Sequence, residues 1–98
     1  MAAGGGGGGG AGGKSMKAVA TDVGDGYMVI NPLVLKKFDK DMIKELYEHL
    51  NKAMGAARNI AAPLTDILAM RQKNMKLQRL HNAIIILRHT ARERRIPL

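Results

Sequence analysis

The closest formal match to a chemical motif in this sequence is a phosphate-binding loop near the N-terminus. The segment Gly8–Ser15 has the required spacing, in which backbone amides surround the phosphates, a lysine reaches the outer phosphates and a serine binds magnesium. Such a loop follows a buried strand and opens a helix. Here only Met-Ala-Ala and glycines precede it, and any Lys-Ser after a glycine run would match. We therefore expect no nucleotide binding.

Other residues that bind metals or act as nucleophiles do not form a site by spacing. Asp22 and Asp25 lie in a glycine-rich stretch like a calcium loop, but Leu33 takes the position where a bidentate glutamate is required. The histidines, at 49, 81 and 89, are never three or four residues apart, as helical zinc ligands are. Cysteine is absent and Ser15 is the only serine. We predict a non-enzymatic protein with no metal and no cofactor.

Composition limits the chain to one small domain. It has 98 residues, and residues 1–15 are mostly glycine, which predicts a disordered, flexible tail. The absence of cysteine excludes a disulfide-stapled secreted domain. No apolar run approaches the roughly 18 residues that span a bilayer, and the first thirty residues lack a secretory apolar core. We therefore expect no membrane span and a cytoplasmic or nuclear location.

The positive charge is concentrated in the last third of the chain. Lys and Arg outnumber Asp and Glu by 16 to 8, and residues 63–98 alone hold eight basic and two acidic residues. Such an excess attracts nucleic acid, an acidic protein or an anionic membrane surface. It is equally typical of a solvated helix face that keeps a protein soluble.

Residues 16–31 have two readings. Residues 27–30 are strand-like, and residues 18–21 could pair with them around the Val-Gly-Asp-Gly turn as a short β-hairpin. A lone two-stranded hairpin is marginal in water, so the segment would need something to pack on. An extended segment that becomes ordered only on a partner is the other reading.

The rest of the chain predicts a helical hairpin. Asn31 and Pro32 favour a helix start, and one apolar stripe then extends through residues 32–54, which predicts one helix. Asp39 is a candidate second cap, at which this helix could break and restart. Gly55 fits a stop. The stripe consists of Leu35, Phe38, Met42, Leu46, Leu50 and Met54, widened by Ile43 and Tyr47. A second helix is predicted over residues 63–95, with Asp66 in its first turn and a length of about 50 Å.

The second predicted helix displays more apolar surface than the first helix can cover. A short heptad seam contains Met70, Leu77, Leu80, Ile84, Leu87 and Ala91, so this helix is coiled-coil-like. A second stripe, roughly opposite, contains Leu64, Ile67, Leu68, Met75, Ile85 and Ile86. A helix that is apolar all round is normally buried all round. Either self-association or another protein covers the second face, or residues 16–30 complete a compact monomer.

These features predict an all-α protein with a two-helix interaction domain at residues 32–95. The main functional hypothesis is a small subunit that joins a larger multi-protein complex, as a hetero-complex or homo-oligomer. Its expected partner interface is Met70, Leu77, Leu80, Ile84, Ile85, Ile86 and Leu87. The alternative is a nucleic-acid or chromatin accessory protein that contacts phosphates through Arg88, Arg92, Arg94 and Arg95. A lesser alternative is a calmodulin-type target within residues 75–95.

Overall fold

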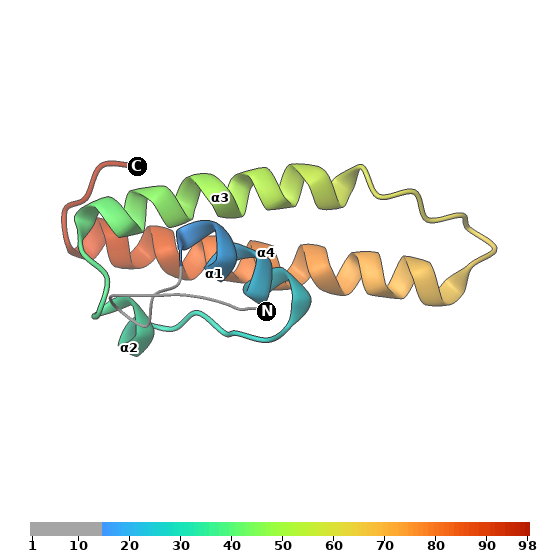
Figure 1. The fold of residues 1–98 in the computed structure, drawn as a ribbon, viewed down its shortest axis with the longest axis horizontal. Coiled ribbons are helices and arrows are strands. Elements are labelled where there is room, and N and C mark those ends of the chain that lie inside the picture. The colour runs from blue at the N-terminus through green and yellow to red at the C-terminus, as the bar shows by residue number, and fades with distance from the viewer. Residues whose placement is uncertain (1–14) are drawn as a thin grey trace.

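A computed structural model describes residues 15–98, which form four α-helices and their connections (Figure 1). The helices are α1 (Met16–Asp25), α2 (Pro32–Leu35), α3 (Lys40–Arg58) and α4 (Ile67–Glu93). Helices α3 and α4 form the hairpin, α1 packs against both of them, and α2 packs against α4. The prediction of an all-α helical hairpin with a long second helix is confirmed. Residues 1–14, with most of the predicted tail and of the phosphate-loop pattern, lie outside the described residues.

The main difference from the sequence-based prediction is that residues 16–25 are helical. The expected β-hairpin or extended segment is wrong for this stretch. Ser15 caps α1, because its Oγ accepts a hydrogen bond from the Ala18 amide at 3.1 Å. The side chains of Met16, Val19 and Val23 recur at helical spacing and are all buried. Packing of this apolar face stabilises a ten-residue helix that would be marginal in isolation.

Two glycines decide how α1 ends against α4. Gly26 has a φ of 86°, in the left-handed region, and closes the helix with hydrogen bonds from its own amide to Val23 and from the Tyr27 amide to Asp22. Gly24 is buried, and a Cβ there would lie 3.3 Å from Cε of Lys76. The missing side chain therefore allows α1 to approach α4 closely.

Residues 32–54 contain two helices rather than the single predicted one, and the break between them precedes the candidate second cap, Asp39. Asn31 caps α2 by accepting from the Val34 amide at 2.9 Å, and Asp39 caps α3 by accepting from the Met42 amide at 2.8 Å. The predicted stop at Gly55 is wrong, since α3 continues to Arg58. The residues after Gly55 are two alanines and an arginine, which favour helix, and Ala57 is buried.

Helix α4 begins four residues later than predicted. Pro63 lies in a turn, in which its carbonyl accepts from the Asp66 amide at 2.9 Å. Asp66 is the N-cap rather than a first-turn residue, and its carboxylate accepts from the Ala69 amide at 3.0 Å. At the other end, Arg95 adopts a left-handed φ of 58° and the Ile96 amide donates to the Ala91 carbonyl. This turn brings Ile96 back into the core.

All four helices contribute to one hydrophobic core. The largest fully buried side chains are Val19, Leu35, Ile43, Leu46, Leu50, Leu80 and Leu87. The predicted apolar stripe of the first long helix is confirmed, with Met42 and Tyr47 only partly buried at its edge. All buried residues of α4 lie at or after Leu80. The core therefore occupies the part of the hairpin that α1 and α2 cover.

We expect the two ends of α4 to respond differently to truncation of leucine. Leu80→Ala should lower the free energy of unfolding by about 3 kcal/mol, because it opens a cavity in the core. Leu68→Ala should change it by less than about 0.5 kcal/mol, because this side chain is 64% exposed. Urea unfolding monitored by circular dichroism measures both values. Equal losses for the two variants would contradict this assignment of the core.

We also expect opposite effects from alanine at two glycines. Gly26→Ala should destabilise by about 1–2 kcal/mol, because of the positive φ and because the new Cβ would lie 3.0 Å from the Arg79 guanidinium carbon. Gly55→Ala is the matched control inside α3, where nothing lies within 4 Å, and should stabilise by roughly 0.5–1 kcal/mol. Thermal unfolding of both variants tests the pair, and a stabilising Gly26→Ala would be inconsistent with the capping role of Gly26.

Candidate functional site

The residues expected to form the partner interface lie mostly inside the chain's own core. Leu80 and Leu87 are fully buried, and Ile84 is buried with them. Met70, Leu77 and Ile86 are half-buried, which leaves Ile85 as the one clearly exposed member. These residues are buried because α1 and α2 cover the part of α4 that the predicted first helix alone could not cover. Leu80, Ile84 and Leu87 offer no surface to a partner while this fold is intact.

Exposed apolar residues lie instead at the far end of the hairpin, and a second exposed apolar group, Tyr27, Val29 and Leu33, lies between α1 and α2 and in α2 itself. Leu64 is 83% exposed, Ile67 70% and Leu68 64%, and Met75 is also exposed. The structure describes every residue from Arg58 to Arg79, and none of them is buried. We refer to residues 58–79 as the distal arm. It comprises the end of α3, the connecting loop and the first half of α4. Lys76 and Arg79 near its end contact α1, whereas the loop and the first turns of α4 extend past α1 and α2 (Figure 1).

A trough lies where α1 ends against the distal arm. Its volume is about 500 Å³, and we call it the α1-end trough. Helix α4 contributes Leu68, Arg71, Gln72, Met75, Lys76 and Arg79, and α1 contributes Gly24 and Asp25. A second depression of about 400 Å³ lies on the other side of Arg71 and Met75 and contains Ile67. Apolar and cationic side chains are therefore exposed together on this half of α4.

The distal arm is also strongly basic. It holds five Lys or Arg residues and one acidic residue, Asp66, whose carboxylate caps α4. Lys76 pairs with Asp25 at 3.5 Å, and Arg79 donates to the Gly24 carbonyl at 3.3 Å, so both cations hold the end of α1. Arg71 is exposed and has no hydrogen bond or ion pair with the described residues. Its positive charge is available to an incoming group.

The arginines predicted to contact phosphates have different roles in the structure. Arg94 reaches across to the end of α2, where it donates to the carbonyls of Leu35 at 3.1 Å and Phe38 at 2.9 Å. It acts as a structural cap for that turn. Arg88 and Arg92 are exposed and line a shallow depression of about 220 Å³ with Ile85 and His89. Arg95 is exposed in the turn that follows α4.

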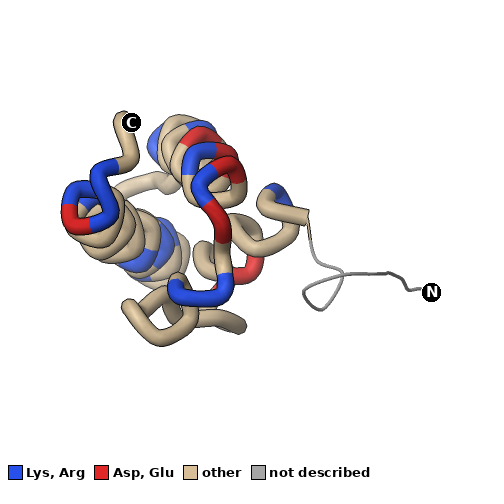
Figure 2. Tube along the Cα trace, turned by 90° about the vertical axis from the view of Figure 1, so that its left-hand side faces the viewer, with Lys and Arg blue, Asp and Glu red and all other residues tan. Residues whose placement is uncertain are grey.

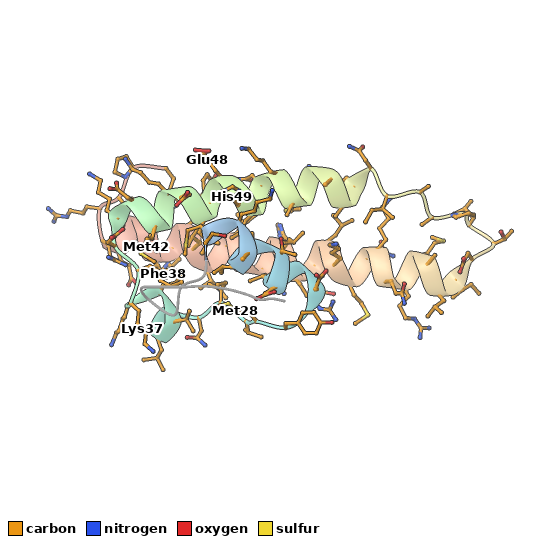
Figure 3. The ribbon with its side chains drawn as sticks, viewed as in Figure 1. Met28, Lys37, Phe38, Met42, Glu48 and His49 are labelled. Carbon is orange, nitrogen blue, oxygen red and sulfur yellow. The ribbon has the colours of Figure 1, made fainter. Side chains whose placement is uncertain are left out.

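The α2–α3 turn brings further charges to this same end of the molecule. Because Arg94 binds the carbonyls on either side of Lys36 and Lys37, these lysines lie beside the end of α4. Lys37 points outward, as does Glu48 on α3, whereas Phe38 and Met42 meet at the junction of the two segments (Figure 3). Seen end-on, basic and acidic positions are interleaved along α3 (Figure 2). This end is mixed in charge, unlike the distal arm.

No metal-binding group is formed by the described residues, among which no three of His, Cys, Asp and Glu lie together. His49 is on α3, His81 is on α4, and His89 lies 3.7 Å from Glu93 in an exposed pair. None of the four helices in the described part is long and apolar enough to cross a membrane. The exposed apolar and cationic groups of the distal arm can take part in non-covalent binding.

The sequence pattern indicated this apolar surface, although the predicted partner interface was assigned to other residues of the same helix. Leu64, Ile67, Leu68 and Met75 formed the second apolar stripe, which was expected to need a cover. Only the fold distinguishes them from Ile86, which packs against the core. No protein-family model, curated protein or solved structure matches this chain.

We expect the arginines near the end of α4 to differ in their effect on stability. Arg94→Ala should lower the free energy of unfolding by about 1–2 kcal/mol, because two carbonyl acceptors lose a charged donor at a partly exposed position. Arg88→Ala, a matched loss of charge at an exposed site, should change it by less than about 0.5 kcal/mol. Chemical denaturation measures the free energy of unfolding of both variants. Indistinguishable values would argue against a structural role for Arg94.

Proposed function

We propose that this protein is a small, non-catalytic helical subunit that binds a protein partner through its distal arm. The observation that carries the proposal is the contrast between the two halves of α4. From Leu80 onward its apolar face is buried in the chain's own core, whereas Ile67 and Leu68 in its first turn, and Leu64 just before the helix, remain largely exposed. Contiguous exposed apolar surface is typical of interaction sites.

Burial of these side chains would provide a substantial driving force for association. A fully buried Leu, Ile or Met side chain contributes roughly 1.5–3 kcal/mol. The distal arm has no buried residue of its own, so a partner would also restrict the motion of the loop and the start of α4. We expect the complex to form in the cytoplasm or the nucleus.

The alternative of a nucleic-acid accessory protein has less support. It relied on four arginines as phosphate contacts, and Arg94 already donates to two backbone carbonyls. The remaining three share their end of the molecule with acidic residues of α3 (Figure 2). A calmodulin-type target within residues 75–95 would require the buried Leu80, Ile84 and Leu87 to leave the core. Binding through the distal arm needs no such unfolding.

Site-specific photo-crosslinking followed by reconstitution tests the proposal. A photoreactive amino acid replaces Leu68 in one sample and Glu45, an exposed residue of α3, in the control. The Leu68 sample should be cross-linked in cells to a protein that the Glu45 sample does not capture. The purified partner should then bind the full chain at least roughly tenfold more weakly when Leu68 is replaced by Ser, which corresponds to about 1.4 kcal/mol.

Two outcomes would reject a partner-binding role for the distal arm. One is cross-linking to the same proteins from Leu68 and Glu45. The other is unchanged affinity of the purified partner for Leu68→Ser, with circular dichroism showing that the variant is folded. Because Leu68 is largely exposed, the substitution should leave the unfolding transition nearly unchanged.

A further inference from the structure

We infer that the α1-end trough binds a short, acidic, amphipathic helix of the partner, placed in line with α1. This inference rests on the proposed function and specifies the chemistry of the partner. The partner helix would extend the layer that α1 forms over the α3–α4 hairpin. It would bring apolar residues onto Leu68 and Met75 and carboxylates toward Arg71.

The lengths of the helices leave room for this element. Helix α1 has 10 residues, about 15 Å, whereas α4 has 27 residues, about 40 Å. The end of α1 contacts α4 at Lys76 and Arg79. The nine residue steps from Ile67 to Lys76, about 14 Å, extend past α1. The open stretch therefore accommodates two to three turns of another helix.

One stripe of α4 extends through both the covered and the open regions. Leu68, Met75, Arg79 and Ile86 follow one another at steps of seven, four and seven residues, which places them on one face. Beyond Arg79, Val23 of α1 and Met28 line a groove with Ile86. Before Arg79, the same face is the floor of the α1-end trough. The covered part of this α4 face therefore binds the apolar end of a helix, α1, and the segment that follows it.

The charges favour an acidic occupant. Where α1 occupies this face, Asp25 supplies a carboxylate to Lys76 and Gly24 supplies a carbonyl to Arg79. Arg71, which precedes Lys76 by five residues on α4, lines the open part of the trough and has no ion pair among residues 15–98. With five basic residues and one acidic residue in the distal arm, carboxylates on the partner complement the local field.

Two other occupants fit the surface less well. A second copy would place like-charged distal arms together, or would offer the α3 stripe of Asp41, Glu45 and Glu48. None of the exposed large apolar residues belongs to α3, so that stripe supplies charge without apolar contact. An anionic membrane would match the charge, but Lys76 and Arg79 in the trough are already bonded to the end of α1, which leaves few cations there for lipid headgroups.

Titration of the full chain with a designed probe tests the inference. The probe is a covalently stapled helical peptide of about 12 residues, ~18 Å long, with leucines on one face and glutamates beside them. A lysine version is its control. In ¹⁵N-labelled protein the glutamate peptide should shift the amides of residues 68–79 and bind at least roughly tenfold more tightly than the lysine peptide at low salt. Raising the salt from about 50 mM to about 500 mM should reduce this preference.

Charge reversal at two exposed arginines provides the matched comparison. Arg71→Glu should weaken binding of the glutamate peptide about tenfold, whereas Arg88→Glu, which lies outside the trough, should leave it unchanged. Equal binding of both peptides, or no binding of either, would overturn the inference. So would binding of phosphatidylserine vesicles in preference to the glutamate peptide, or self-association in sedimentation experiments that Leu68→Ser abolishes.

The partner identified by cross-linking separates this inference from the proposed function. If Leu68→Ser weakens that complex but Arg71→Glu and high salt do not, the distal arm binds a protein and the acidic-helix assignment is wrong. If Leu68→Ser has no effect, both proposals fail. Weakening by both variants, with Arg88→Glu neutral, supports both.

Discussion

The fold depends on α4 from Arg79 to its C-cap at Arg94, because every other helix packs against this helix. Its apolar side chains from Leu80 onward form one side of the core. Its arginines fix the ends of the two short helices, because Arg79 donates to the Gly24 carbonyl of α1 and Arg94 donates to the Leu35 and Phe38 carbonyls beside α2. Short helices leave a large share of their backbone carbonyls unpaired at their ends, so these contacts determine where α1 and α2 lie.

This arrangement divides α4 into two regions with different roles. The covered region stabilises the chain, and the distal arm provides its exposed apolar and basic surface. Since α1 ends at Lys76 and Arg79, the boundary between the two is set by the length of one ten-residue helix. The distal arm, where coverage by the chain is least, holds five basic residues and one acidic residue. A surface of this kind combines an apolar driving force with electrostatic selection among partners.

Local features of the fold were predictable because they depend on neighbouring residues. The caps at Asn31 and Asp39, the break between them and the apolar stripe through Leu46 and Leu50 follow from side chains within one or two turns. Helix α1 was also encoded, by Ser15 and the spacing of the buried valines. The β-hairpin or extended segment predicted there does not form, because burial of this apolar face outweighs the low helix propensity of valine and glycine. The stop predicted at Gly55 is absent for a similar reason, because glycine can adopt the helical conformation and α3 continues through it to Arg58.

The sequence by itself determined that two long amphipathic helices form a hairpin, that the second carries two apolar stripes and that most of the net positive charge lies in the last third. Only the tertiary structure decided which of those stripes is used internally. The reason is physical: periodicity shows that a face is apolar, but its cover is a distant segment, here residues 16–30. The same holds for charge, since composition counts Arg71 and Arg94 alike. The fold places Arg94 on backbone carbonyls and leaves Arg71 exposed beside Leu68.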